Sequence, residues 1–295
     1  MQVTDEQLHA WSHRGDPLQA WHTFTSIQWT LTKGLRDYDC DIYPQGSYGN
    51  GTNLEHDSDV DVVVALRSAF YSDTSELDEN ELAAYENCYT RDDVTWADFR
   101  EVVGDILQKH YFSTSEGPKC TDVGRGLFRL TADVLVSVNF RYYQGFVSCQ
   151  KQEFKEGVRF YHNATEIENY PKRHMAASRR KDRESGGRFK KVVRIAKNAR
   201  NAAVKDDASR MEKTTAPSYY VESLLWNVPT DVYKKDHVTS YKCALTWLDG
   251  QRDHFGSFWY PHGMGKLFGA VKDKPWRQED AALLLDELMA QLPRD

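Results

Sequence analysis

Two aspartates, Asp59 and Asp61, open the segment Asp-Val-Asp-Val-Val-Val-Ala-Leu. Its β-branched residues predict a strand, in which side chains two residues apart point to the same face. Two carboxylates held side by side raise each other's pKa unless a cation lies between them. Mg²⁺ or Mn²⁺, which prefer oxygen ligands, are the natural cations for such a pair. The pair alone is also compatible with two solvent-facing aspartates on an edge strand.

The segment before this strand adds a second kind of chemistry. Gly46-Ser47 and Gly51-Thr52 lie in a stretch rich in glycine and small polar residues, which predicts a turn. Glycines let a backbone approach a phosphate closely, and exposed N–H groups together with a serine hydroxyl can hold an anion. A phosphate-binding turn beside a pair of metal-binding carboxylates indicates a site for a nucleoside triphosphate.

A third carboxylate is expected from a neighbouring strand. Asp133 lies near the start of the alternating segment Thr-Ala-Asp-Val-Leu-Val-Ser-Val, whose valines occupy the face opposite to it. We expect Asp133 to join Asp59 and Asp61, although an aspartate at this position can also cap the end of a strand. Asp57 also precedes the pair, and we interpret it as a loop residue.

The elements that must position these residues change in character along the chain. Apolar periodicity predicts helices over 18–37, 96–111, 187–204, 217–228, 239–250 and 277–292. Strands are expected at 40–43, from Asp59 onward and over 126–143, and a polar loop over 71–93. We therefore expect an α+β fold. Residues 1–150 would form the catalytic sheet lobe with its N-terminal helix, and residues 151–295 a mainly helical, nucleotide-binding lobe.

Composition excludes several classes of protein. Of the 295 residues 40% are apolar, enough for a core, so a disordered chain is excluded. The longest apolar runs are about five residues, far short of the ~20 of a membrane span. The N-terminus lacks the pattern of a signal peptide, which predicts a cytoplasmic protein. The five cysteines are widely spaced, so we expect free thiols and no zinc site.

Charge is unevenly distributed along the chain. The net charge of −6 gives no support for a protein that binds duplex nucleic acid. Residues 73–105 hold eleven acidic and two basic residues, whereas residues 172–200 hold twelve basic and two acidic ones. Within the basic block, Lys190, Arg194 and Lys197 recur at helical spacing and predict a basic stripe beside an apolar one. Such a stripe fits a polyphosphate, and a solvated helix face is the alternative.

The stretch Gly46-Ser-Tyr-Gly-Asn-Gly-Thr-Asn-Leu-Glu-His-Asp-Ser-Asp-Val-Asp-Val-Val-Val resembles the nucleotidyltransferase signature of the polymerase-β-like superfamily. It is most similar to the branch that holds oligoadenylate synthases, cyclic GMP-AMP synthase and the bacterial CD-NTases. Later blocks resemble the bacterial CD-NTases: Glu156-Gly-Val-Arg-Phe, Asn169-Tyr-Pro-Lys-Arg-His, Phe189-Lys-Lys-Val-Val-Arg and Pro217-Ser-Tyr-Tyr-Val-Glu. The resemblance covers about residues 18–230.

This resemblance implies a polymerase-β-like sheet lobe, a helical lobe and a long N-terminal helix spanning both. It implies that Asp59, Asp61 and Asp133 hold two Mg²⁺ or Mn²⁺ ions. Lys190 and Ser218 would hold the triphosphate of the donor nucleotide, together with Gly46 and Ser47. Either Tyr219 or Tyr220 could stack on a base or pack in the core. Asn169 matches a position near the base in some family members, although an ordinary turn asparagine is the favoured interpretation.

The resemblance further implies an enzyme that joins ribonucleoside triphosphates, ATP among them, into a cyclic di- or trinucleotide for anti-phage signalling. A separate effector protein would read the product, and no membrane would be needed. The acidic block at 73–105 disfavours a long nucleic-acid track, so we expect no nucleic-acid activator despite the kinship to such sensors. One alternative is a terminal RNA or tRNA nucleotidyltransferase, or an enzyme that modifies a small molecule or a protein. A catalytically silent binding module is another, and the intact Asp59, Asp61 and Asp133 disfavour it.

Overall fold

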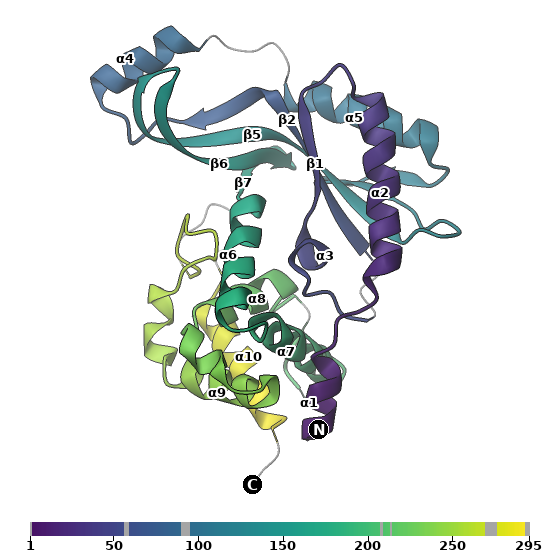
Figure 1. Cartoon of the computed structure of the whole chain (residues 1–295), viewed down its shortest axis with the longest axis vertical. Coiled ribbons are helices and arrows are strands. Elements are labelled where there is room, and N and C mark those ends of the chain that lie inside the picture. Colours follow the sequence, from purple (N-terminus) through teal and green to yellow (C-terminus); the bar gives the residue numbers. More distant parts are fainter. Residues whose placement is uncertain are drawn as a thin grey trace. The chain divides into compact units, whose positions relative to one another are not determined.

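A computed structural model describes residues 2–55, 59–89, 95–206, 209–212, 214–268 and 276–292 (Figure 1). It divides the chain into two compact units. The first, here called the sheet unit, comprises Pro17–Gln45 and Ser58–Lys172. The second, the helical unit, comprises Met1–Asp16, Gly46–Asp57 and Arg173–Asp295. Asp57, expected in a loop, lies outside the described residues.

The sheet unit is built on a seven-stranded mixed sheet with the order β1-β2-β5-β4-β3, extended by β6, which pairs with β5, and by β7, which pairs with β6. The pairing of β2 with β5 is parallel, and the other pairings are antiparallel. The strands are β1 Cys40–Pro44, β2 Asp59–Asp73, β3 Thr114–Glu116, β4 Thr121–Val123, β5 Thr131–Ser148, β6 Lys151–His162 and β7 Thr165–Asn169.

Two helices pack on this sheet and on each other, α2 (Pro17–Gly34) and α5 (Trp96–His110). Each buries an apolar stripe at helical spacing, as expected for helices that cover a sheet on one side. Thr95 begins α5 with a reciprocal capping box to Asp98, which satisfies N–H groups of the first turn. The buried stripes are Phe24, Ile27 and Leu31 in α2, and Phe99, Val103 and Leu107 in α5.

The helical unit is organised around α7 (Phe189–Val204), whose stripe of Phe189, Val192, Val193 and Ala196 is buried as the sequence predicts. Its other helices are α1 Asp5–Trp11, α3 Gly46–Asn50, α6 Pro171–Glu184, α8 Ser218–Trp226, α9 His237–Asp249 and α10 Gln278–Ala290, with short 3₁₀ helices at Thr230–Lys234 and Arg252–Ser257. Among the described residues, no helix combines the length and the apolar content needed to cross a bilayer.

The mixed sheet and the helical unit confirm the predicted α+β class, but several boundaries differ from the expected ones. The predicted loop at 71–93 contains the end of β2 and a helix, α4 (Glu79–Cys88), begun by a capping box at Asp78. The predicted turn at 44–52 contains α3. The N-terminal helix α2 ends at Gly34, and its expected span across both lobes stays a prediction.

The expected division at residue 150 is also different in the structure. Residues 151–172 belong to the sheet unit because β6 and β7 extend its sheet, and the residues 1–16 and 46–57 belong to the helical unit. Charged residues recur along β6, and only Val158 and Phe160 among its apolar residues are buried, so no apolar run marks it as a strand. The functional roles expected of the two lobes stay predictions.

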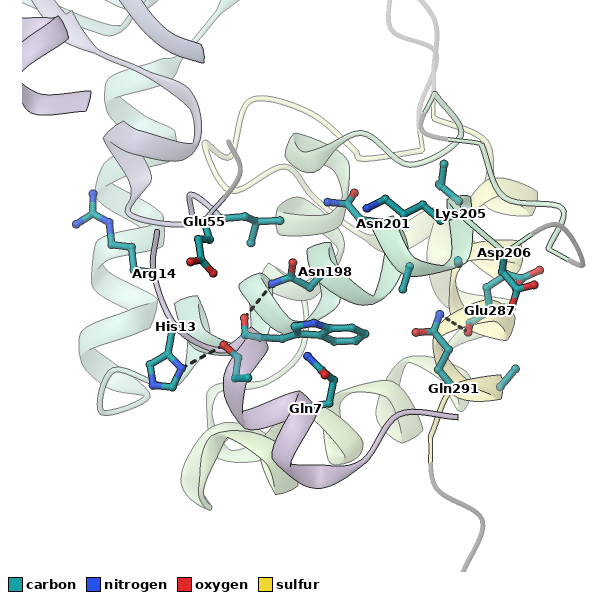
Figure 2. A pocket seen from close by; sticks show the side chains of 17 residues that line it. Gln7, His13, Arg14, Glu55, Asn198, Asn201, Lys205, Asp206, Glu287 and Gln291 are labelled. Carbon is teal, nitrogen blue, oxygen red and sulfur yellow. Dashed lines mark hydrogen bonds between the residues drawn. The ribbon is translucent and has the colours of Figure 1, made fainter. Parts of the chain in front are cut away.

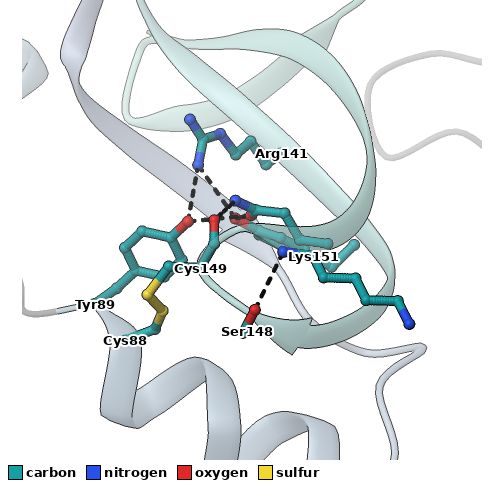
Figure 3. Close-up of a disulfide and its surroundings, with 8 residues drawn as sticks. Cys88, Tyr89, Arg141, Ser148, Cys149 and Lys151 are labelled. Carbon is teal, nitrogen blue, oxygen red and sulfur yellow. Dashed lines mark hydrogen bonds between the residues drawn. A yellow bond between two sulfur atoms is a disulfide. The ribbon is translucent and has the colours of Figure 1, made fainter.

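A disulfide corrects the expectation of free thiols for two of the five cysteines. Cys88, at the end of α4, is bonded to Cys149, in the turn between β5 and β6 (Figure 3). Their Cα atoms are 5.9 Å apart, within the usual range for a disulfide. Cys40, Cys120 and Cys243 are free. The two bonded residues are 61 positions apart, so only the fold brings them together.

A substitution at Gly157 of β6 tests how closely this part of the sheet unit is packed. A Cβ atom there would lie 2.7 Å from the backbone oxygen of Asn169 and 2.8 Å from the Tyr170 ring. We expect Gly157→Ala to cost about 1–3 kcal/mol of unfolding free energy, because neither backbone nor buried ring can withdraw easily. The measurement is the Tm of both proteins. Gly265→Ala, where a Cβ meets nothing within 4 Å, is the control and should leave Tm unchanged.

Candidate active site

Three carboxylates share one face of the sheet unit. Asp59 and Asp61 lie two residues apart on β2, and Asp133 is the register partner of Asp61 on the parallel strand β5. Neighbouring residues across paired strands point to the same side, so the three side chains gather where the sequence predicts them. Asp59 is exposed and the other two are half-buried, whereas the residues between them, Val60 and Ala132, are buried.

A fourth carboxylate adjoins this group. Asp122 of β4 is the register partner of Asp133 on the other side of β5. Ligand atoms of Asp122, Asp133 and Cys120 all lie within 4.8 Å of one another. Asp122 could not be predicted from the sequence, because a three-residue strand is too short to show alternation. On the outer side, the Thr131 hydroxyl donates a hydrogen bond to Asp59.

The electrostatics of this face favour a cation. Burial, the charges of Asp122 and Asp59, and a hydrogen bond with Asp122 raise the pKa of the Asp133 carboxyl above its ordinary value. Burial and the same kind of like-charge repulsion raise the pKa of the Cys120 thiol to about 12, so this thiol stays protonated at neutral pH. The donors on this face that carry charge at neutral pH are therefore carboxylate oxygens, which fit a hard divalent cation.

A second group of predicted residues lies in the helical unit, around the segment 46–53. Gly46 and Gly51 bracket α3 with φ of +63° and +69°, a conformation that favours glycine at both positions. The Thr52 N–H donates to the Ser47 carbonyl over 2.8 Å and closes the turn that carries Ser47. In the sheet unit, Gln45, which directly precedes Gly46, donates its N–H to the Asp61 carbonyl over 2.9 Å.

Two cations converge on Gly51. A Cβ atom at this glycine would lie 3.9 Å from Lys190 Nζ and 3.8 Å from Arg14 Cζ, so a side chain there would occupy the space beside both charges. Burial lowers the pKa of the Lys190 ammonium, and the charges of Arg179 and Arg14 lower it as well. Nearby acidic groups raise this pKa, but the net shift is downward. Such a cluster is suited to an anion. Arg14 has no sequence motif around it and was missed.

Arg194 and Lys197 have partners other than the triphosphate expected for them. They are 7% and 1% exposed. Arg194 donates to the carbonyls of Ser12 and Gly51 over 2.6 and 2.7 Å, and Lys197 Nζ donates to the Thr52 carbonyl over 2.8 Å. These two side chains hold the backbone of segment 46–53 through hydrogen bonds, and they do not present an exposed charge beside it.

The remaining predicted residues fall in different places. Ser218 begins α8, and its Oγ accepts a hydrogen bond of 3.3 Å from the buried Arg200. The Tyr219 ring is 37% exposed and stacks on His174 with 4.8 Å between centroids. Asn169 ends β7 in the sheet unit and accepts the Tyr170 N–H with its own side chain, as a turn asparagine does.

A large cavity elsewhere in the helical unit contains none of the predicted site residues. It measures about 1120 Å³ and lies beside α1, α7 and α10, with Trp11, Asn198 and Gln291 among its walls (Figure 2). Asn198 in its wall donates to the Trp11 carbonyl, and Gln291 donates to the Glu287 carbonyl. The candidate site is therefore defined by the residues described above and not by this cavity, whose wall includes only Arg14 among them.

Two family models match the chain. Residues 176–292 match the cGAS/DncV-like nucleotidyltransferase C-terminal helical domain, and residues 30–113 match the nucleotidyltransferase domain. The chain is 31% identical to the cyclic UMP-AMP synthase of Rhodothermus marinus, over 97% of this chain and 96% of that one. It is 29% identical to the cyclic nucleotide synthase CdnE01 of Staphylococcus haemolyticus, over 98% of each.

Solved structures agree with these matches. The structure of Rhodothermus marinus CdnE c-UMP-AMP synthase with Apcpp and Upnpp superimposes with a TM-score of 0.83, covering 97% of this chain and 95% of that one at 31% identity. A CdnE cyclic dinucleotide synthase of Elizabethkingia meningoseptica gives 0.79 over 98% of both chains at 21% identity, which shows the same fold.

Repulsion on the acidic face gives a testable result. Because the folded protein keeps the Asp133 proton to higher pH than the unfolded chain, ionisation of this group lowers stability at neutral pH. Asp133→Asn should therefore raise the Tm of the metal-free protein at pH 7, by roughly 1–3 °C. It should also reduce the further increase that Mg²⁺ or Mn²⁺ gives the wild type. Asp105→Asn, an exposed carboxylate on α5, is the control and should change neither value.

Proposed function

The chain belongs to the cGAS/DncV-like nucleotidyltransferases, and we propose that it joins ribonucleoside triphosphates, ATP among them, into a cyclic di- or trinucleotide. The observation that carries this proposal is the gathering of Asp59, Asp61 and Asp133 on one face of the sheet. The relatives named as cyclic nucleotide synthases match this chain over nearly its whole length, which supports the same reaction here. One of them is solved with analogues of ATP and UTP.

The chemistry is transfer of a nucleotidyl group. A 3′- or 2′-hydroxyl oxygen of the acceptor nucleotide forms a bond to the donor α-phosphorus, and the bond from that phosphorus to the leaving oxygen breaks to release pyrophosphate. A second transfer within the same product closes the ring. Two Mg²⁺ or Mn²⁺ ions, when bound, activate the hydroxyl and neutralise charge on the phosphates.

The carboxylates of the sheet unit have the metal-binding role in this proposal. Asp59 and Asp61 would hold both cations, and Asp133 would hold mainly the one near the attacking hydroxyl. Asp133 is also the candidate acceptor of the hydroxyl proton. Asp122 stands beside Asp133 as its register partner on β4.

The helical unit has the nucleotide-binding role. Ser47 and the backbone after Gly46 contact phosphate oxygens, and Lys190 supplies positive charge beside Gly51. Ser218 contributes a hydroxyl to the triphosphate. The exposed ring of Tyr219 is the candidate stacking surface for a base, with Asn169 near the base in the relatives' pattern. Arg194 and Lys197 act indirectly, by holding the carbonyls of Gly51 and Thr52.

We further propose that the product is a diffusible signal in defence against phage. A separate effector protein reads it, and no duplex nucleic acid is required for synthesis. The acidic block at 73–105 supports the last point, because a surface rich in carboxylates repels a phosphate backbone.

Products made from all four ribonucleoside triphosphates with Mg²⁺ test the reaction. We expect mass spectrometry to show a phosphatase-resistant cyclic di- or trinucleotide that contains adenine. A linear polymer or an extended RNA acceptor as the sole product would contradict cyclisation. A repeat with duplex DNA or RNA should give the same yield, and strong stimulation would contradict synthesis without an activator.

The double substitution of Asp59 and Asp61 by alanine tests the metal site. We expect turnover to fall by at least about 1,000-fold, because metal charge at the transition state is among the largest stabilising effects in such a reaction. The measurement is pyrophosphate release at saturating nucleotide, with Asp105→Ala as the matched control in the same unit. Retention of more than about a tenth of wild-type turnover by the double variant would rule out this assignment of the metal ligands.

A further inference from the structure

One buried carboxylate lies at the centre of the helical unit's nucleotide-binding residues. Glu222 of α8 is 4% exposed and accepts hydrogen bonds from side chains on two other segments of the same unit, segment 46–53 and α6. The donors are Asn50 Nδ2 at 3.1 Å, Thr52 Oγ1 at 3.3 Å, His174 Nε2 at 3.0 Å and Ser178 Oγ at 2.6 Å. All four donor residues are buried as well.

The donors keep this carboxylate charged. Burial by itself raises the pKa of Glu222, but the hydrogen bonds from His174, Ser178 and Asn50, with the charge of His174, outweigh it, and the pKa lies below its ordinary value. An anion with four donors is satisfied at both oxygens, whereas a neutral group of the same shape could accept only about half as many. The arrangement therefore depends on the negative charge.

One arm of this cluster fixes the phosphate-binding segment. Asn50 and Thr52 flank Gly51, where Lys190 and Arg14 converge. Thr52 is held twice, by its hydroxyl to Glu222 and by its carbonyl to Lys197, and its N–H closes the turn onto the Ser47 carbonyl. Glu222 thus fixes the position of Ser47 through one intermediate residue, Thr52.

The other arm reaches the candidate base-stacking surface. His174 of α6 donates to Glu222 and stacks on the Tyr219 ring, with 30° between the planes. Tyr219 lies three residues before Glu222 on α8, and the centroid of its ring is 5.9 Å from that of the Tyr260 ring. The Glu222 carboxylate is therefore linked through Thr52 to the turn that carries Ser47, and through His174 to the ring of Tyr219.

We propose that Glu222 is a positioning residue for the nucleotide, holding the Ser47 turn and the Tyr219 ring in one fixed arrangement before the nucleotide binds. This inference rests on the proposed function for the identity of the ligand, a nucleoside triphosphate. Glu222 itself has no contact with reacting atoms in this role, because its oxygens are occupied by the four donors. Preorganisation of this kind lowers the entropic cost of binding.

The test is Glu222→Gln, which keeps the shape and removes the charge. We expect the Kd of a non-hydrolysable ATP analogue with Mg²⁺ to rise by at least about tenfold, since an amide nitrogen would face donors in place of an acceptor oxygen. KM for the nucleotides should rise in parallel. The turnover rate at saturation should stay within about threefold, because the metal-binding carboxylates are untouched.

Two further variants separate positioning from general loss of stability. Tyr233→Phe removes another buried hydrogen bond of the helical unit, from the phenol to the Leu225 carbonyl at 2.7 Å, without touching segment 46–53. It should leave Kd within about twofold of the wild type. Ser178→Ala removes one donor from Glu222 and should raise Kd about threefold, so it serves if Glu222→Gln does not fold.

The outcomes are distinct. Wild-type Kd in a folded Glu222→Gln protein, or in Ser178→Ala where that protein does not fold, overturns the inference. An equal loss of affinity in Tyr233→Phe also overturns it. Calorimetric binding needs no turnover, so a wild type that binds the analogue but makes no cyclic product contradicts the proposed function and leaves the Kd comparison valid.

Discussion

Repulsion between carboxylates is the constraint on which the sheet unit depends. The parallel pairing of β2 with β5 sets Asp61 beside Asp133, and the antiparallel pairing of β4 sets Asp122 on the other side. Without a cation, these groups lower the stability of the sheet that carries them. The valines between them bury the opposite face and hold the strands in this register. Core packing thus sustains a carboxylate repulsion that a bound cation would relieve.

In the helical unit, side chains from other segments hold segment 46–53 in place. The carbonyls of Gly51 and Thr52 accept hydrogen bonds from the buried side chains of Arg194 and Lys197. Each bond gives a partner to a backbone acceptor and to a buried charge. Arg14 holds the same segment through the Tyr48 carbonyl and the Asn53 side chain, and its guanidinium lies with Lys190 beside Gly51.

Local sequence patterns predict those features whose residues are neighbours both in space and in sequence. The Asp59–Asp61 pair, the buried stripe of α7 and the strand of Asp133 follow from periodicity alone. Asp122, Arg14 and Glu222 did not, because each acts through a partner far away along the chain. Glu222 is the one charged residue of the apolar helix α8, and only its four donors show why a carboxylate is buried there. β6 was missed because charged residues recur along it and interrupt its apolar pattern.

The path of the chain has a consequence for how the protein is made on the ribosome. The helical unit draws on residues 1–16, 46–57 and 173–295, with the sheet unit supplied by the stretches between them. The Val3 N–H donates to the Gln291 carbonyl over 2.8 Å, so the first and last parts of the helical unit pair with each other. A nascent chain cannot complete this unit until about the last residue of α10 has emerged. Segment 46–53, although synthesised early, must wait for Arg194, Lys197 and Glu222 before it is held in place. The segment proposed to bind phosphate is therefore not held in place in a nascent chain that ends before Glu222.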